Sequence, residues 1–283
     1  SPLTASGTTT TVSANATFGC WYNRNEYTMT VISGANGQVT AKAVSQGTSA
    51  VAGSGASTTL TVRYGDTVQG TASANTGYSF SSWSGYLTGT TNPSTGAAVS
   101  ANASITGSFS DTTAPVVTIT GGTSGKSTSQ PFTITCTDGV GVVGTYWGTT
   151  SASSGTSFSA VTSATSVTAS GNATAATTYY AACKDNAGNI GSASVVVRSY
   201  TVSNMLLNLA GTKGTYTTAN YTINGSASTY YIKTGTALAA ASICTAPTGG
   251  SIAGYKAAAP STTNASPLTA SGTTTTVSAN ATF

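Results

Sequence analysis

Histidine is absent from the 283-residue chain, and only five residues are acidic. His is the commonest general base and a frequent zinc ligand, so its absence excludes a Ser-His-Asp triad and most zinc sites. The carboxylates are far apart in the sequence, at Glu26, Asp66, Asp111, Asp138 and Asp185. A glycosidase pair would therefore have to be assembled by the fold. The composition predicts a protein that is not an enzyme and that needs no cofactor.

Long apolar runs and clusters of charge are missing as well. No run approaches the roughly 18 apolar residues of a membrane-spanning helix. The nine basic residues, which give a net charge of +4, are spread thinly, whereas a nucleic-acid surface needs a focused basic patch. The sequence therefore predicts no membrane span and no nucleic-acid partner. Because only 5% of the residues are charged, we expect a surface that is buried in an assembly or covered by sugars.

The residues that are abundant favour β-structure. Ser and Thr dominate the composition, and 39% of the residues are hydrophobic, enough to build cores. Thr, Val and Tyr fit the pleated surface of a strand. The sequence contains no convincing amphipathic helix, and the best short candidates are Asn204–Ala210 and Thr236–Ser242. We expect an all-β fold, with a β-sandwich and smaller β-modules arranged end to end.

The chain begins and ends on the same eighteen residues, SPLTASGTTTTVSANATF, at positions 1–18 and 266–283. Two explanations are open. The chain is slightly more than one period of a longer tandem repeat, or a terminal strand is given to a neighbouring subunit and fills an open sheet edge. Both make this segment a connector between units. We favour the tandem repeat, because strand exchange needs no second identical copy.

Residues 26–111 contain two patterns typical of strands and turns. Alternation at Tyr27, Met29 and Val31, a turn at 34–37 and further alternation at 39–43 predict two strands facing a core. Later comes VRYGDTVQGTASANTGYSFSSWSG, with Gly-x-x-Val and then Tyr-x-Phe-x-x-Trp-Ser-Gly. This segment resembles the divergent B-repeat of internalin-like bacterial surface proteins. The resemblance implies a small β-rich module without catalytic residues.

Residues 112–202 contain the second motif set. The unit starts at DTTAPVVTITGG, CKDNAGNIG lies near its end, and Trp147 lies eleven residues after Cys136. The region resembles the bacterial immunoglobulin-like domains of surface proteins. In an immunoglobulin fold such a Trp packs against an inter-sheet disulfide. The resemblance therefore implies a Cys136–Cys183 disulfide and an extracellular location, where such bonds persist.

Residues 203–283 contain YYIKTGTALAA, GYKA and VSANATF. They resemble the β-grasp repeat of the same surface proteins, truncated at its end. The expected continuation stands at residues 12–31, VSANATFGCWYNRNEYTMTV. Residues 1–25 are therefore interpreted as the last strand of a preceding β-grasp unit. By position, Cys244 is predicted to bond a Cys20 of the following repeat or adjoining subunit; two free thiols are the alternative.

Weaker patterns suggest ligand sites. Asp111, Asp138 and Asp185 could converge at one end of the sandwich and hold calcium. Stabilisation of turns is the favoured role for these side chains, so no metal is predicted. The three tryptophans, Trp21, Trp83 and Trp147, could form sugar-binding platforms, but each occupies a motif position typical of a core.

Asn-x-Ser/Thr sequons offer weak glycosylation sites, because a chain so rich in Ser and Thr contains them by chance. They lie at Asn15, Asn102, Asn172, Asn220, Asn224, Asn264 and Asn280. Taken together, the resemblances imply a secreted, non-catalytic bacterial surface protein, whose tandem β-domains form a stalk, fibre or filament with copies of itself. The alternative is an adhesin whose repeats bind a glycan or a host surface.

Overall fold

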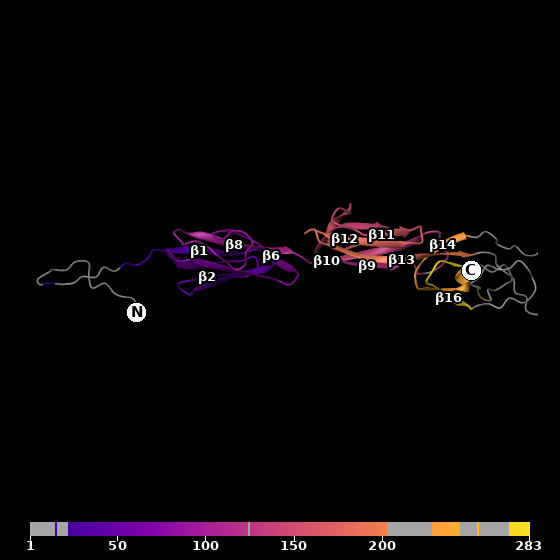
Figure 1. Cartoon of the computed structure of the whole chain (residues 1–283), viewed down its shortest axis with the longest axis horizontal. Helices are drawn as coiled ribbons and strands as arrows, with labels where there is room; N and C mark the ends of the chain where they lie inside the picture. Colours follow the sequence, from indigo (N-terminus) through magenta and orange to yellow (C-terminus); the bar gives the residue numbers. More distant parts are fainter. Residues whose placement is uncertain (1–14, 16–21, 124, 203–227, 244–253, 255–271) are drawn as a thin grey trace, which may run out of the picture. The chain divides into compact units, whose positions relative to one another are not determined.

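The computed structural model describes residues 15, 22–123, 125–202, 228–243, 254 and 272–283 (Figure 1). The chain forms two compact units, Ser1–Thr112 and Thr113–Phe283. Apart from one helical turn, every regular element among the described residues is a strand. The prediction of an all-β fold is therefore confirmed. No helix in this described part is long and apolar enough to cross a bilayer.

The first unit is a sandwich of two four-stranded sheets. One sheet has the order β4-β1-β8-β6, in which β1 and β8 run parallel. Its strands are β1 (Glu26–Ser33), β4 (Ser57–Arg63), β6 (Tyr78–Gly85) and β8 (Ala103–Asp111). The other sheet has the order β3-β2-β5-β7. Its strands are β2 (Gly37–Ala43), β3 (Ser49–Ala52), β5 (Val68–Ala74) and β7 (Ser94–Thr95).

The core of this unit follows the period-two alternation of the sequence. Met29 and Val31 of β1 and Val39 and Ala41 of β2 are all buried, as predicted. However, β1 and β2 belong to opposite sheets. The turn at residues 34–37 therefore passes from one layer to the other instead of closing a hairpin within one sheet.

The second unit begins with a sandwich of five strands. They are β9 (Val116–Gly121), β10 (Gln130–Gly148), β11 (Ser159–Ala173), β12 (Thr178–Asp185) and β13 (Ile190–Val202). The long strand β10 shifts register between Thr137 and Gly144. Before the shift it pairs with β9 and β11, and after it β10 also pairs with β12. One continuous strand therefore contributes to both layers.

Strand β13 continues from this sandwich into a second, smaller core. Residues 190–196 pair with β12, and residues 197–202 pair with β14. The other elements here are β14 (Ser228–Lys233), β15 (Thr236–Ala239), α1 (Ala240–Ile243), β16 (Thr274–Val277) and β17 (Ala281–Thr282). Their buried side chains are Tyr200, Ile232, Leu238, Ile243, Val277 and Phe283.

The short helix candidate Thr236–Ser242 is a strand in its first half, and only Ala240–Ile243 form a helical turn. Residues 236–239 form β15, which pairs antiparallel with residues 274–277. Leu238 faces the small core from this strand, so the distant pairing partner overrides the local preference. The second helix candidate, Asn204–Ala210, lies outside the described residues. The four predicted segments, 1–25, 26–111, 112–202 and 203–283, stay predictions as domain boundaries.

Candidate functional site

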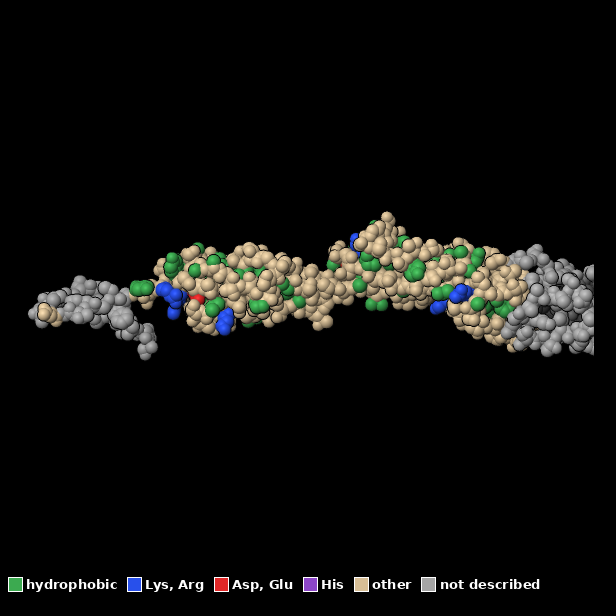
Figure 2. All heavy atoms as spheres, viewed as in Figure 1, with side chains coloured by type: hydrophobic (Ala, Val, Ile, Leu, Met, Phe, Trp, Pro, Cys, Tyr) green, Lys and Arg blue, Asp and Glu red, His purple; other side chains and the backbone are tan. Residues whose placement is uncertain are grey.

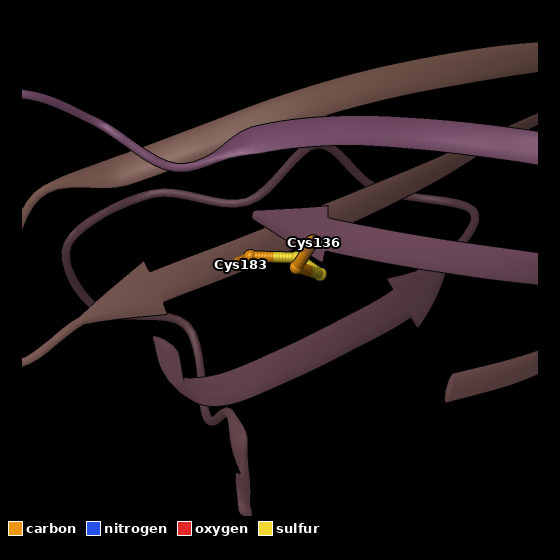
Figure 3. The surroundings of a disulfide bond; sticks show 2 residues. All are labelled: Cys136 and Cys183. Atoms are coloured by element: carbon orange, nitrogen blue, oxygen red, sulfur yellow. A yellow bond between two sulfur atoms is a disulfide. The ribbon is translucent and has the colours of Figure 1, made fainter. Parts of the chain in front are cut away.

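The sandwich of the second unit contains a disulfide between Cys136 and Cys183 (Figure 3). Cys136 lies on β10 opposite Val117 and Val167, whereas Cys183 lies on β12 opposite residues of β10 and β13. The Cα atoms are 6.2 Å apart, within the span of a disulfide. Because the two cysteines are not ladder partners, the bond joins the two layers through the buried core. Cys20 and Cys244 lie outside the described residues.

Aromatic rings pack beside this bond. Trp147 stacks on Tyr179 with ring centroids 5.2 Å apart, and the ring centroid of Phe132 lies 5.6 Å from that of Trp147. A Cβ atom on Gly171 would lie 2.4 Å from the Trp147 ring, so a glycine is needed beneath it. In the first unit Trp83 is only 3% exposed. Both tryptophans therefore pack in cores, and Trp21 lies outside the described residues.

Asp138 and Asp185 lie close together in the second unit, with carboxylate oxygens within 4.8 Å of each other. Both side chains are buried. Asp138 Oδ1 accepts hydrogen bonds from the amides of Val140 at 2.8 Å and Gly141 at 3.0 Å. These bonds stabilise the turn within β10, which is the role favoured from the sequence.

Asp185 organises the turn after β12 in the same way. Its Oδ1 accepts hydrogen bonds from the amides of Gly188 at 2.7 Å and Asn189 at 2.8 Å, and Asn189 Nδ2 donates to its Oδ2 at 2.8 Å. The third residue of the hypothetical calcium set, Asp111, ends β8 in the first unit. The three-residue calcium site therefore stays a hypothesis.

We expect Asp185→Ala to lower the free energy of unfolding of the second unit by about 1–3 kcal/mol, because two turn amides lose their side-chain acceptor. Asp185→Asn keeps one oxygen acceptor and should cost less. Denaturant unfolding measures both. The turn role also predicts equal stability in excess calcium and in chelator. A calcium-dependent rise that Asp185→Ala abolishes would show instead that the carboxylate is a metal ligand.

Asp66 is a buried carboxylate of the first unit, 1% exposed, and no motif in the sequence predicted a role for it. Its Oδ1 accepts hydrogen bonds from Ser45 N at 3.0 Å, Ser45 Oγ at 2.6 Å and Thr67 N at 2.8 Å. It therefore links the turn after β2 to the start of β5. Burial raises the pKa of Asp66, but the hydrogen bonds from Ser45 and Thr67 outweigh it, so the pKa lies below its ordinary value.

The lowered pKa of Asp66 predicts acid sensitivity of the first unit. A depressed folded-state pKa contributes stability above the unfolded pKa, about 3.9, and that contribution is lost as the pH falls through the folded-state value. We expect Asp66→Asn to be less stable than the wild type at neutral pH. The difference should shrink when unfolding is followed from about pH 5 to pH 2. A difference that is constant with pH would contradict this origin.

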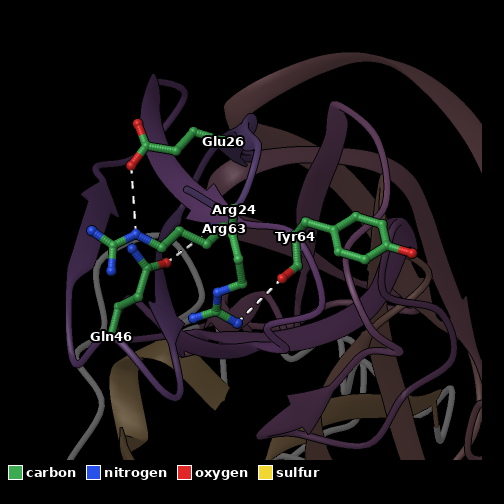
Figure 4. Close-up of polar contacts among 5 residues, drawn as sticks. All are labelled: Arg24, Glu26, Gln46, Arg63 and Tyr64. Carbon is green, nitrogen blue, oxygen red and sulfur yellow. Dashed lines mark hydrogen bonds and ion pairs between the residues drawn. The ribbon is translucent and has the colours of Figure 1, made fainter. Parts of the chain in front are cut away.

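Glu26 offers a matched control, because it is an exposed carboxylate in the same unit. Its Oε1 lies 3.5 Å from Arg63 Nε, and both side chains are more than half exposed (Figure 4). Exposed ion pairs contribute about 0–1 kcal/mol. Glu26→Gln should therefore leave the stability of the first unit nearly unchanged at every pH.

The surface is sparsely charged. Figure 2 shows few blue or red side chains on the visible face of either unit. Four sequon asparagines are described, and all are exposed: Asn15, Asn102, Asn172 and Asn280. Two of them also have structural roles, since Asn102 Oδ1 accepts from Thr28 N and Asn280 Oδ1 from Ser199 N. Asn220, Asn224 and Asn264 lie outside the described residues.

Comparison with known proteins gives no match: no family model matches the chain, and neither a curated protein nor a solved structure is significantly similar to it.

Proposed function

We propose that the chain is a non-catalytic structural repeat of a secreted bacterial fibre, stalk or filament. One observation carries the proposal. Residues 272–283 supply β16 and β17 to the small core of the second unit, and the same sequence occurs at residues 7–18. A segment that completes a folded unit and recurs after 265 residues is typical of an array in which each unit contacts mainly its neighbours.

Two further features support an extracellular assembly. The disulfide between Cys136 and Cys183 suits an oxidising environment. The sparse surface charge favours association, since a strongly charged surface keeps soluble proteins apart. Copies of the same chain are therefore the proposed partners.

Immunogold electron microscopy of the native protein tests the proposal. Antibodies against the purified chain should label extended fibres at a constant axial spacing. The mass of the intact protein, or of its cross-linked assemblies, should rise in steps of one repeat. Label on isolated compact particles, with a single mass, would contradict a fibre.

Exposed aromatic side chains favour the second candidate function, an adhesin that binds glycans. Tyr22 is 88% exposed and Tyr64 is 53% exposed. Figure 4 shows the Tyr64 ring pointing away from the polar contacts around Arg63, and a ring that is half exposed could stack on a sugar. A glycan array decides this: saturable binding that Tyr64→Ser weakens would support an adhesin over a purely structural repeat.

A further inference from the structure

The last twelve residues lie in an acceptor site formed by the preceding strands of the second unit. Strand β16 pairs with β15, and the short strand β17 pairs in parallel with β13. The amide of Phe283 donates to Thr201 O at 2.8 Å, and Gly235 N donates to Val277 O at 2.8 Å. Backbone bonds of this kind do not depend on which chain supplies the strand.

Two apolar side chains anchor the segment. Val277 is 1% exposed and Phe283 is 8% exposed. Phe283 packs edge-on against Tyr200, with ring centroids 6.2 Å apart. Burial, with a smaller effect of Tyr230, raises the pKa of Tyr200 to about 12. Tyr200 is also fully buried, so the contact of Val277 and Phe283 with this core removes apolar surface from water.

Two strands of the acceptor, β13 and β14, are held by contacts outside this segment, whereas β15 pairs with the segment itself. Strand β13 belongs to the disulfide-bonded sandwich, and β14 is tied to it by Gln130 Nε2, which donates to Tyr231 O at 2.6 Å. Lys233 N donates to Gly122 O at 3.0 Å, and Tyr200 Oη donates to Gly125 O at 2.8 Å. These contacts hold β13 and β14 in place whether or not the last strand belongs to the same chain.

The sequence of the occupant is present twice. Val12, Asn15 and Phe18 stand where Val277, Asn280 and Phe283 stand in the second copy. In the second copy these residues are the buried anchor, the acceptor of the Ser199 amide and the terminal aromatic. An acceptor that binds residues 272–283 cannot distinguish them from residues 7–18, because every side chain is the same.

We propose that the N-terminal copy of this segment, residues 1–18 of one chain, places its last twelve residues in the acceptor that residues 272–283 fill here, in a second copy of this chain. The inference rests on the proposed function as a structural repeat, and it names the segment and the surface that link successive copies. The link between two copies consists of strand pairing and the burial of apolar side chains, so no covalent bond is needed.

The test uses the full chain with its own last strand disabled by Val277→Asp and Phe283→Ala. A buried unpaired carboxylate and a lost aromatic ring remove the occupant from its site. We expect light scattering to show dimers and longer assemblies, because residues 1–18 of another chain are intact. Adding Val12→Asp and Phe18→Ala should return the protein to monomers. The chain with only these two N-terminal substitutions is the control, and it should be monomeric.

A peptide titration measures the binding of this segment directly, and it does not depend on whether the variants assemble. A fluorescent peptide with the sequence of residues 1–18 should bind the four-substitution chain at one site per chain. The same peptide with Asp at the position of Val12 should bind at least about 100-fold more weakly. Absence of peptide binding, or assemblies that persist when both copies are substituted, would overturn the proposal. If native fibres with a constant spacing are still observed, the structural-repeat function stands and only the exchange of this segment fails.

Discussion

Replacing both Cys136 and Cys183 with alanine should lower the free energy of unfolding of the second unit by about 4 kcal/mol. The bond closes a loop with a sequence separation of 47 residues, and the loop-closure entropy removed from the unfolded chain corresponds to ~4 kcal/mol for a loop of this length. Because Cys136 and Cys183 lie on strands that are not ladder partners, their bond is a covalent link between the layers. Denaturant unfolding followed by far-ultraviolet circular dichroism measures the loss.

The first unit is the internal control for this experiment, since neither cysteine contributes to it. Its transition should keep the same midpoint in the wild type and in the double variant. A reductant should shift the second unit of the wild type by a similar amount. An unchanged second transition, or an equal shift of both transitions, would contradict a local inter-layer bond.

The sequence predicted which residues face the cores better than it predicted which strands are neighbours. Alternation at Met29, Val31, Val39 and Ala41 is a local property, because successive side chains of a strand point to opposite faces. The same alternation suits a hairpin and a crossing between layers equally well. Only the pairing of β1 with β4 and β8, and of β2 with β3 and β5, decides between them.

Two features that the sequence did not predict, the role of Asp66 and strand β15, both depend on residues far away in the sequence. The role of Asp66 depends on Ser45, 21 residues earlier, which only the fold brings to its carboxylate. Strand β15 forms because residues 274–277 pair with it. By contrast, the turn roles of Asp138 and Asp185 are local, since each carboxylate bonds amides two to four residues onward. Asp138 is followed by Gly139 and Asp185 by Asn186, and Asp, Asn and Gly all favour turns.

Trp83→Ala should lower the free energy of unfolding of the first unit by about 3–5 kcal/mol, the range typical of a large buried aromatic. The ring lies between the two sheets: Cβ atoms on Gly70 of β5 and on Gly107 of β8 would each lie 3.2 Å from it. Both neighbours are glycines, so no side chain at either position can move into the cavity. Calorimetry of the two transitions measures the effect, and the second unit should be unaffected.

Trp83→Phe separates the packing of the ring from its hydrogen bond. Trp83 Nε1 donates to Thr91 O at 2.8 Å, and the loss of one such bond costs about 0.5–1.5 kcal/mol. Phe retains a ring beside Phe80, whose centroid lies 4.8 Å away, although it leaves part of the space of the indole empty. The Phe variant should therefore fall between the wild type and Trp83→Ala. If both variants lose the same free energy of unfolding, the contribution of Trp83 comes from its hydrogen bond to Thr91 and not from the packing of its ring against Gly70 and Gly107.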